Sequence, residues 1–200
     1  LTLPRKDKRV PPYFSMLWSH EVPKLIEHDD QGRASEIRVV AGHLGGQSAP
    51  KPPPNSWAAR PEADIGLWTA RLLPGATWTL PAANPGTNRA IYFFRGASLE
   101  VGEHPLTVGQ GVRVQPDVAL TLTNGIADAE ILVLQGRPIG EPVVKHGPFV
   151  MNTPGEIRQA YADYQRTRFG GWPWAGNDPV HGEKFERFAR HADGREERPT

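Results

Sequence analysis

Short segments in which apolar and polar residues alternate recur through the middle of the chain. Three of them span residues 76–80, 97–101 and 120–123, each with turn residues nearby. Because successive side chains of a strand point to opposite faces of a sheet, this period of two predicts half-buried β-strands. Two continuous apolar runs, 90–94 and 131–134, are typical of strands buried on both faces, and we expect them at the centre of the sheets.

The first part of the chain is also strand-like. Residues 13–18 and 37–41 are rich in aromatic and β-branched residues, and Asp29 to Gly32 between them has the composition of a turn. Residues 48–61 hold several prolines and predict an extended surface loop. Many short strands with no convincing helix among them favour a β-sandwich or barrel over a parallel α/β fold.

A helix is predicted after this region. Thr153 and Glu156 form a capping box around Pro154 at the first helical position, and Gly170 can end the helix. Apolar residues follow at helical spacing, namely Ile157, Ala160, Tyr161 and Tyr164. We therefore expect one amphipathic helix over residues 153–170, followed by a charged tail in which basic and acidic residues balance.

Composition excludes several classes of function. The chain of 200 residues has 21 Gly, 21 Pro and no Cys, which excludes a disulfide framework, a thiolate metal site and a cysteine nucleophile. Its net charge of +1 is too small to favour direct nucleic-acid binding. The longest apolar run, Ala90 to Phe94, falls far short of the roughly 20 residues that a membrane helix needs. We expect a soluble, cytoplasmic chain without a membrane partner.

Histidine spacing gives no sign of a local metal site. The chain has seven histidines, and no two of them stand at the spacing of an H-x-H strand pair or an H-E-x-x-H helix pair. The sequence also lacks a complete nucleophile elbow, dinucleotide fingerprint or phosphate loop. It therefore predicts no catalytic residue and no local metal site, and leaves open only a site whose ligands converge from distant positions.

Four stretches resemble the C-terminal half of the pirins, which are bicupin proteins of the cupin superfamily. They are residues 3–13, which look like the interdomain linker of the family, Val39 to Gly42, the block 67–136, and Glu141 to Thr153. The last block is the most specific, and it departs from the family where His146 stands in place of Tyr. The tail 169–199 is similar to extensions on bacterial members.

The resemblance implies an all-β cupin or jelly-roll β-barrel with one C-terminal amphipathic helix. The implied organisation is a linker at 1–10, the barrel at 11–152, the helix at 153–170 and an extended charged tail at 171–200. It also implies an N-terminal cupin domain, with iron held by histidines and a glutamate, upstream of Leu1. The chain begins with Leu1 and its first methionine is Met16, which fits this expectation.

The cupin metal motifs are altered in this chain. Matched to the first motif, Arg89 stands at the glutamate position, and Pro81 and Ala83 stand at the two histidine positions with one extra residue before Arg89. In the second motif, Thr121 stands at the last histidine. None of these is a usual metal ligand, and the cationic Arg89 would repel a metal ion. We expect no metal and no other cofactor in this barrel.

Three functional hypotheses follow. The preferred one is a metal-free C-terminal cupin domain that packs against a metal-bearing N-terminal domain, in a family linked to iron-dependent quercetin 2,3-dioxygenase activity; this chain alone is then not the enzyme. The second is a non-catalytic, co-regulator type protein-interaction module using Trp57, Trp172 and Trp174, although we favour the interpretation that these residues cover the barrel and helix. The third is a small-molecule cavity inside the barrel near Arg89, Tyr92 and Thr121, against which Tyr92 can serve core packing and Arg89 a surface ion pair.

Overall fold

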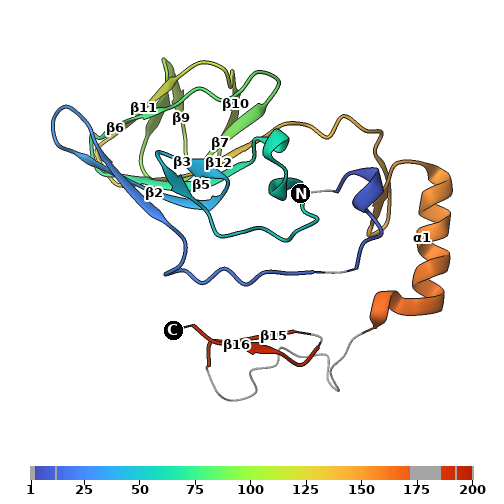
Figure 1. Ribbon diagram of the computed structural model, residues 1–200. Coiled ribbons are helices and arrows are strands. Elements are labelled where there is room, and N and C mark those ends of the chain that lie inside the picture. Colours follow the sequence, from blue (N-terminus) through green and yellow to red (C-terminus); the bar gives the residue numbers. More distant parts are fainter. Residues whose placement is uncertain (1–2, 12, 172–185, 192, 200) are drawn as a thin grey trace. The chain divides into compact units, whose positions relative to one another are not determined.

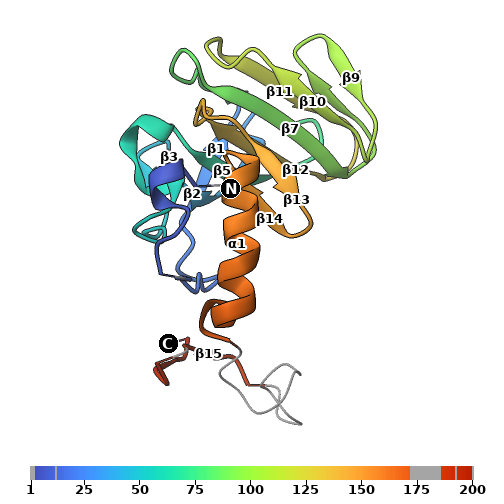
Figure 2. The ribbon, with the colours of Figure 1, turned by 90° about the vertical axis from the view of Figure 1, so that its right-hand side faces the viewer.

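A computed structural model describes residues 3–11, 13–171, 186–191 and 193–199 (Figure 1). Its contacts divide the chain into two compact units, 1–140 and 141–200. The first unit consists of two antiparallel sheets that curve around one interior (Figure 2). The all-β fold predicted from the alternating segments is confirmed for this unit.

The strands of the first unit follow a fixed order. The larger sheet runs β1 (Lys24–His28), β2 (Ala34–Ala41), β5 (Gly66–Leu72), β12 (Ala129–Gly136), β7 (Asn88–Arg95) and β10 (Gly111–Val114). The smaller sheet runs β6 (Thr77–Leu80), β11 (Leu120–Asn124), β8 (Leu99–Val101) and β9 (His104–Leu106). Shorter elements are β3 (His43–Leu44), β4 (Gln47–Ser48), and the 3-10 turns η1 (Arg5–Asp7), η2 (Trp57–Ala59) and η3 (Pro61–Ala63).

The barrel core lies between the sheets. Inward-facing side chains alternate with outward-facing ones along β6, β8 and β11, as the period-two pattern predicts. The largest fully buried side chains are Trp78, Phe93, Ile37, Leu72, Leu80 and Ile91. Removing this apolar surface from water is the main stabilising contribution to the barrel.

Two expectations about strands are wrong. β7 and β12 are central, but they are not buried on both faces, because alternate side chains point away from the barrel: Tyr92, Phe94 and Leu134 are 44%, 50% and 36% exposed. Residues 13–18 form no strand in the described structure, since no neighbouring strand pairs with them; the first strand is β1.

The second unit holds the predicted helix. It contains the hairpin of β13 (Val144–His146) and β14 (Phe149–Met151), then α1 (Pro154–Thr167), η4 (Arg168–Gly170), β15 (Ala189–Arg190) and β16 (Glu196–Glu197). The α-helix ends before Gly170 because Arg168 and Phe169 adopt left-handed backbone angles, with φ of 49° and 51°. The hairpin lies within residues 11–152, which were predicted to form the barrel. Its Met151 packs with Ile157 and Ala160 of α1.

The start of α1 depends on the predicted cap. The Thr153 hydroxyl accepts a hydrogen bond from the Glu156 N–H at 3.2 Å, and the Glu156 carboxylate accepts one from the Asn152 N–H at 3.1 Å. We expect Thr153→Ala to destabilise the helix by about 1 kcal/mol, because an amide loses its partner. Hydrogen exchange of the first-turn amides measures this. Thr153→Ser keeps the hydroxyl, so equal loss in both variants would contradict the capping role.

Candidate functional site

The second residue of β7 is an arginine inside the barrel. Arg89 is 2% exposed. Its Nη1 donates a hydrogen bond to the Pro81 carbonyl oxygen at 2.7 Å, and its Nε donates to the side-chain oxygen of Gln135 at 3.0 Å. Gln135 lies directly across from Arg89 in the pairing of β12 with β7. The sheet register therefore supplies the partner that makes burial of this guanidinium tolerable.

Asp64 extends this polar network. The Gln135 side-chain amide donates to the Asp64 carbonyl oxygen at 3.2 Å, and the Asp64 carboxylate accepts from the Thr87 hydroxyl at 2.8 Å. Burial lowers the pKa of the Arg89 guanidinium, and the negative charge of Asp64 partly offsets that effect. The network fixes Arg89 between two strands of the larger sheet and the end of β6.

The residues at the cupin metal positions do not fit a metal ion. Pro81 and Ala83 carry no donor side chain, and the guanidinium of Arg89 lies against the backbone of Pro81. Thr121 is exposed and its hydroxyl lies 3.5 Å from that of Thr79 on the neighbouring strand. In the part of the chain that the structure describes, no three His, Asp or Glu side chains gather in a way that could hold a metal.

The structure places the three predicted cavity residues on different faces of the sheets. Arg89 faces the interior, whereas Tyr92 lies on the outer face of the same strand and Thr121 on the exposed face of the smaller sheet. The period of two along β7 separates residues 89 and 92, since an odd spacing reverses the face. Arg89 was predicted to form a surface ion pair as its ordinary role, and the structure instead buries it.

An open cleft lies on the outer side of the larger sheet. Its volume is about 530 Å³, and it touches both Arg89 and Tyr92 but not Thr121. Its walls are mostly apolar and include one predicted interface residue, Trp57, whose indole N–H donates to the Arg137 carbonyl oxygen at 2.8 Å. Trp172 and Trp174 lie outside the described residues. The other main lining residues are Ala90, Arg113, Leu134, Arg137 and Ile139.

The two other arginines of this cleft were not predicted from the sequence. Arg113 stands opposite Ala90 in the pairing of β10 with β7, and Arg137 follows the end of β12. Alternation can place Arg113 on the outer side of its strand. It cannot show that β10 pairs with β7 in this register, which is the fact that brings Arg113 to Ala90.

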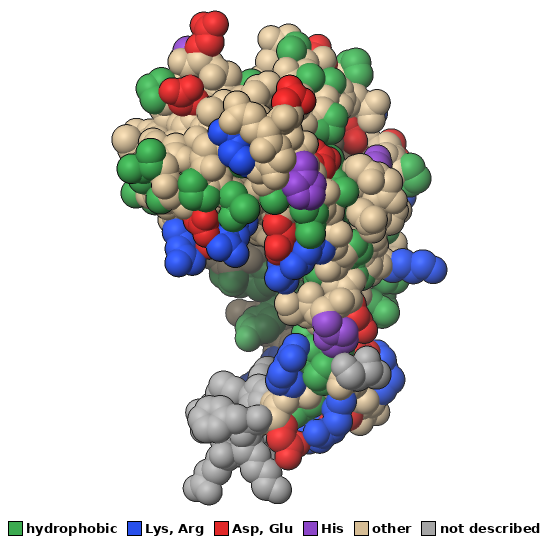
Figure 3. Space-filling model, turned by 90° about the vertical axis from the view of Figure 1, so that its left-hand side faces the viewer, with side chains coloured by type: hydrophobic (Ala, Val, Ile, Leu, Met, Phe, Trp, Pro, Cys, Tyr) green, Lys and Arg blue, Asp and Glu red, His purple; other side chains and the backbone are tan. Residues whose placement is uncertain are grey.

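Charges elsewhere on the barrel are largely balanced. The Lys24 Nζ lies 3.0 Å from the Glu36 carboxylate, and Arg71 forms an ion pair with Asp128. The face seen in Figure 3 mixes basic and acidic side chains. Such mixing agrees with the small net charge and gives no continuous basic surface for a phosphate backbone on that face.

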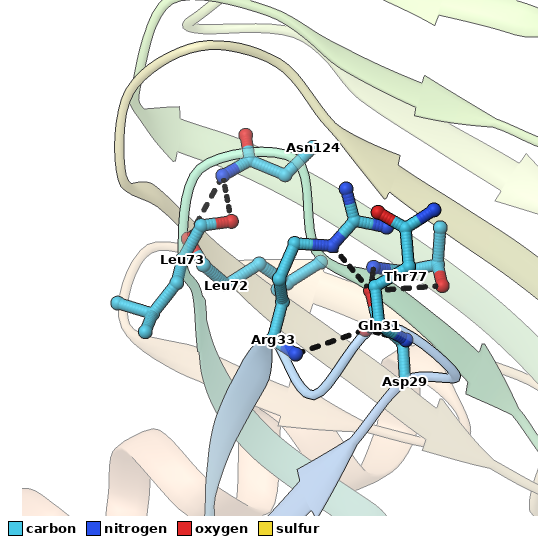
Figure 4. A network of polar contacts seen from close by, with 7 residues as sticks. All are labelled: Asp29, Gln31, Arg33, Leu72, Leu73, Thr77 and Asn124. Carbon is cyan, nitrogen blue, oxygen red and sulfur yellow. Dashed lines mark hydrogen bonds and ion pairs between the residues drawn. The ribbon is translucent and has the colours of Figure 1, made fainter.

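A second polar network joins the two sheets (Figure 4). Asp29, in the turn between β1 and β2, accepts hydrogen bonds from Arg33 Nε at 2.8 Å and from the Thr77 N–H of β6 at 3.1 Å. Burial alone would raise the pKa of Asp29, but the hydrogen bonds from Arg33, Thr77 and Gln31 together hold it well below its usual range. This cluster has a structural role, because N–H groups of the protein already donate hydrogen bonds to both carboxylate oxygens of Asp29.

Comparison with known proteins gives a consistent result. Residues 67–170 match the model of the pirin C-terminal cupin domain. A candidate quercetin 2,3-dioxygenase of Pseudomonas aeruginosa is 32% identical over 172 residues, covering 84% of this chain and 54% of that protein. Human pirin is 26% identical over 180 residues, covering 85% of this chain and 55% of its own length.

Solved structures agree with the fold. A crystal structure of quercetin 2,3-dioxygenase from Acinetobacter baumannii superposes with a TM-score of 0.70 at 27% identity, covering 86% of this chain and 55% of that one. The chain spans about half the length of the curated relatives it matches. In its described residues, no helix has the length and apolar character needed to cross a membrane.

Proposed function

Because this chain belongs to the pirin family and carries its C-terminal cupin domain, we propose that it is the metal-free half of a two-barrel protein. In this proposal the barrel packs against an N-terminal cupin domain that bears the metal ion.

The buried Arg89 is the observation that carries the proposal. Its guanidinium stands at the position where the cupin motif has a glutamate ligand, and it is bound by Pro81 and Gln135. A fixed cation at that place opposes a divalent metal by charge, and the nearby carboxylate of Asp64 already accepts a hydrogen bond from Thr87. In this proposal, the hydrogen bonds of Arg89 occupy the place in the barrel that a metal ion has in a metal-bearing cupin.

The outer face of the larger sheet supports the packing role. Ile26 and Phe94 are 53% and 50% exposed, lie on strands of this sheet and do not line the cleft. Exposed apolar side chains gathered on one sheet commonly mark a surface that another protein surface covers. We assign the part of this face around Ile26 and Phe94, outside the cleft, to the N-terminal cupin domain, because the relatives are about twice as long as their match to this chain.

The link to flavonol oxygenation comes from the relatives. The Acinetobacter baumannii protein is named a quercetin 2,3-dioxygenase, and in our proposal the corresponding reaction belongs to the metal-bearing domain. Iron there would supply the chemistry with dioxygen. This chain would contribute the stability and placement of that domain.

We expect the purified 200-residue chain to contain far less than one iron per molecule and to show no flavonol oxygenation. Elemental analysis and quercetin consumption measure the two properties, with the Acinetobacter baumannii quercetin 2,3-dioxygenase as the positive control. Iron at one per chain together with turnover would refute the metal-free assignment.

The coding sequence upstream of Leu1 tests the two-barrel part separately. We expect it to encode two histidines one residue apart, followed by a glutamate. In that longer protein Phe94→Glu should weaken the packing of the domains, measured as separate unfolding transitions, whereas Thr121→Glu on the smaller sheet should not. An upstream sequence without a cupin domain would refute the packing role and leave the metal assignment standing.

A further inference from the structure

We propose that the cleft on the outer side of the larger sheet binds a small aromatic carboxylate. Every residue that lines it belongs to the first unit of this chain. The proposal therefore does not depend on the assignment of the barrel to a two-domain protein, and it is tested on the chain alone.

Small residues create the hollow. Ala90 and Gly136 line it and carry no large side chain that would fill it. Tyr92 lies over Gly111, where an added Cβ would stand 2.7 Å from the ring. The volume of about 530 Å³ falls within the usual range of roughly 300–1,000 Å³ for small-molecule sites.

The walls suit a flat apolar group. Tyr92 and Leu134 rise from neighbouring strands, and Ile139 and Trp57 face the same hollow. The hydrogen bond from the Trp57 indole to the Arg137 carbonyl oxygen holds one aromatic ring in place before any ligand binds. A ring preorganised in this way loses little entropy on binding, and aromatic rings stack favourably on one another.

The charge of the cleft selects an anion. None of the described lining residues is Asp or Glu. The Arg113 side chain makes no hydrogen bond or ion pair with a described residue, and Arg137 bonds only to the Pro85 carbonyl oxygen at 3.1 Å through its guanidinium. The guanidinium of Arg89 adds its positive charge beside the cleft, although its Nη1 and Nε already donate to Pro81 and Gln135.

A neighbouring hollow on the same sheet shows the contrast. That space of about 230 Å³ is lined by Arg38 and Arg71, but also by Glu36 and Glu130. The Arg38 Nε lies 3.8 Å from the Glu36 carboxylate, and Arg71 forms an ion pair with Asp128. Its charges are therefore satisfied within the protein, whereas those of the cleft are not.

An aromatic carboxylate satisfies both features at once. Its ring can lie between Tyr92 and the apolar wall, while its carboxylate accepts paired hydrogen bonds from the planar guanidinium of Arg113. A small inorganic anion would leave the apolar wall unused, and a neutral ring would leave Arg113 unpaired.

The site is tested by titrating the 200-residue chain with 2-naphthoate and measuring the binding by nuclear magnetic resonance. We expect shifts at the Trp57 indole and at the amides of Ala90 and Arg113. The neutral isostere 2-naphthamide should bind about tenfold more weakly, because it lacks the charge-assisted hydrogen bonds. Absence of binding by 2-naphthoate, or shifts that map elsewhere, would overturn the proposal.

Matched variants distinguish a specific binding site from non-specific electrostatic attraction. Arg113→Gln should lower the affinity for 2-naphthoate about tenfold and leave that for 2-naphthamide unchanged, and Tyr92→Ala should weaken both. Arg95→Gln is the control, since Arg95 is an exposed arginine of β7 outside the cleft that pairs with Glu130. Equal effects of Arg113→Gln and Arg95→Gln would show non-specific attraction and refute the site.

Discussion

Replacing Asn124 with aspartate should destabilise the barrel by about 4 kcal/mol at neutral pH. The Asn124 side chain is 4% exposed, and its amide nitrogen lies 2.8–2.9 Å from the carbonyl oxygens of Leu72, Leu73 and Ala127. It therefore joins the end of β11 to the turns on both sides. Aspartate has the same shape but brings a negative oxygen to three carbonyl oxygens in a buried place.

The pH dependence of this variant identifies the cause. Because the carbonyl oxygens disfavour the charged form, the pKa of the new carboxyl would be raised in the folded state. The destabilisation should be small at low pH and should grow as the pH rises above the unfolded value of about 3.9. Urea unfolding with hydrogen exchange of β5 and β11 measures this.

A control for this variant is available on the surface. Asn88 is exposed at the start of β7, so Asn88→Asp should change stability by less than about 0.5 kcal/mol. If the Asn124 variant loses the same stability at low and neutral pH, the negative charge is not responsible, and the predicted repulsion between the carboxylate and the three carbonyl oxygens is wrong.

Much of the fold could be predicted because its elements depend on local patterns. Alternation along β6 and β11 and the cap at Thr153 are set by neighbours in sequence, and both are confirmed. The strand predicted at 13–18 failed because strand formation depends on a distant partner. Burial of 90–94 on both faces failed for a similar reason, since hydrophobicity does not show whether a second layer covers a sheet.

The candidate site was less predictable. The motif comparison singled out Arg89, yet its burial depends on Gln135 standing opposite it in the register of β12 and β7. The cleft brings together residues from η2, β7, β10 and the end of β12. Their spacing in sequence carries no signal, because sheet order and not local periodicity makes them neighbours.

The two polar clusters in Figure 4 lie where the larger and smaller sheets meet. Asn124 of β11 binds the end of β5, and Asp29 beside β1 binds the start of β6. Apolar burial between two sheets is not directional. Directed hydrogen bonds of this kind fix how the strands at one end of the barrel are placed relative to one another. Their loss should therefore destabilise both sheets.

Asp29→Asn should lower the melting temperature of the barrel by roughly 5 °C or more. The Asp29 carboxylate accepts hydrogen bonds from the backbone amides of Gln31, Arg33 and Thr77, as well as from Arg33 Nε. An asparagine side chain has one acceptor oxygen in place of two and presents an N–H to the remaining donors. Calorimetry measures the loss, and Asp30→Asn at the exposed neighbouring position is the control.

The same comparison at low pH tests the electrostatic cause. The pKa of Asp29 is lowered in the folded state, so its contribution to stability is complete above the unfolded value of about 3.9 and is lost as the pH falls toward the folded value. The difference between the natural chain and Asp29→Asn should therefore be constant near neutral pH and narrow in strong acid. A difference that stays the same throughout would mean that the carboxylate's charge contributes nothing, and that the shape of the turn alone holds β6 to the β1–β2 hairpin.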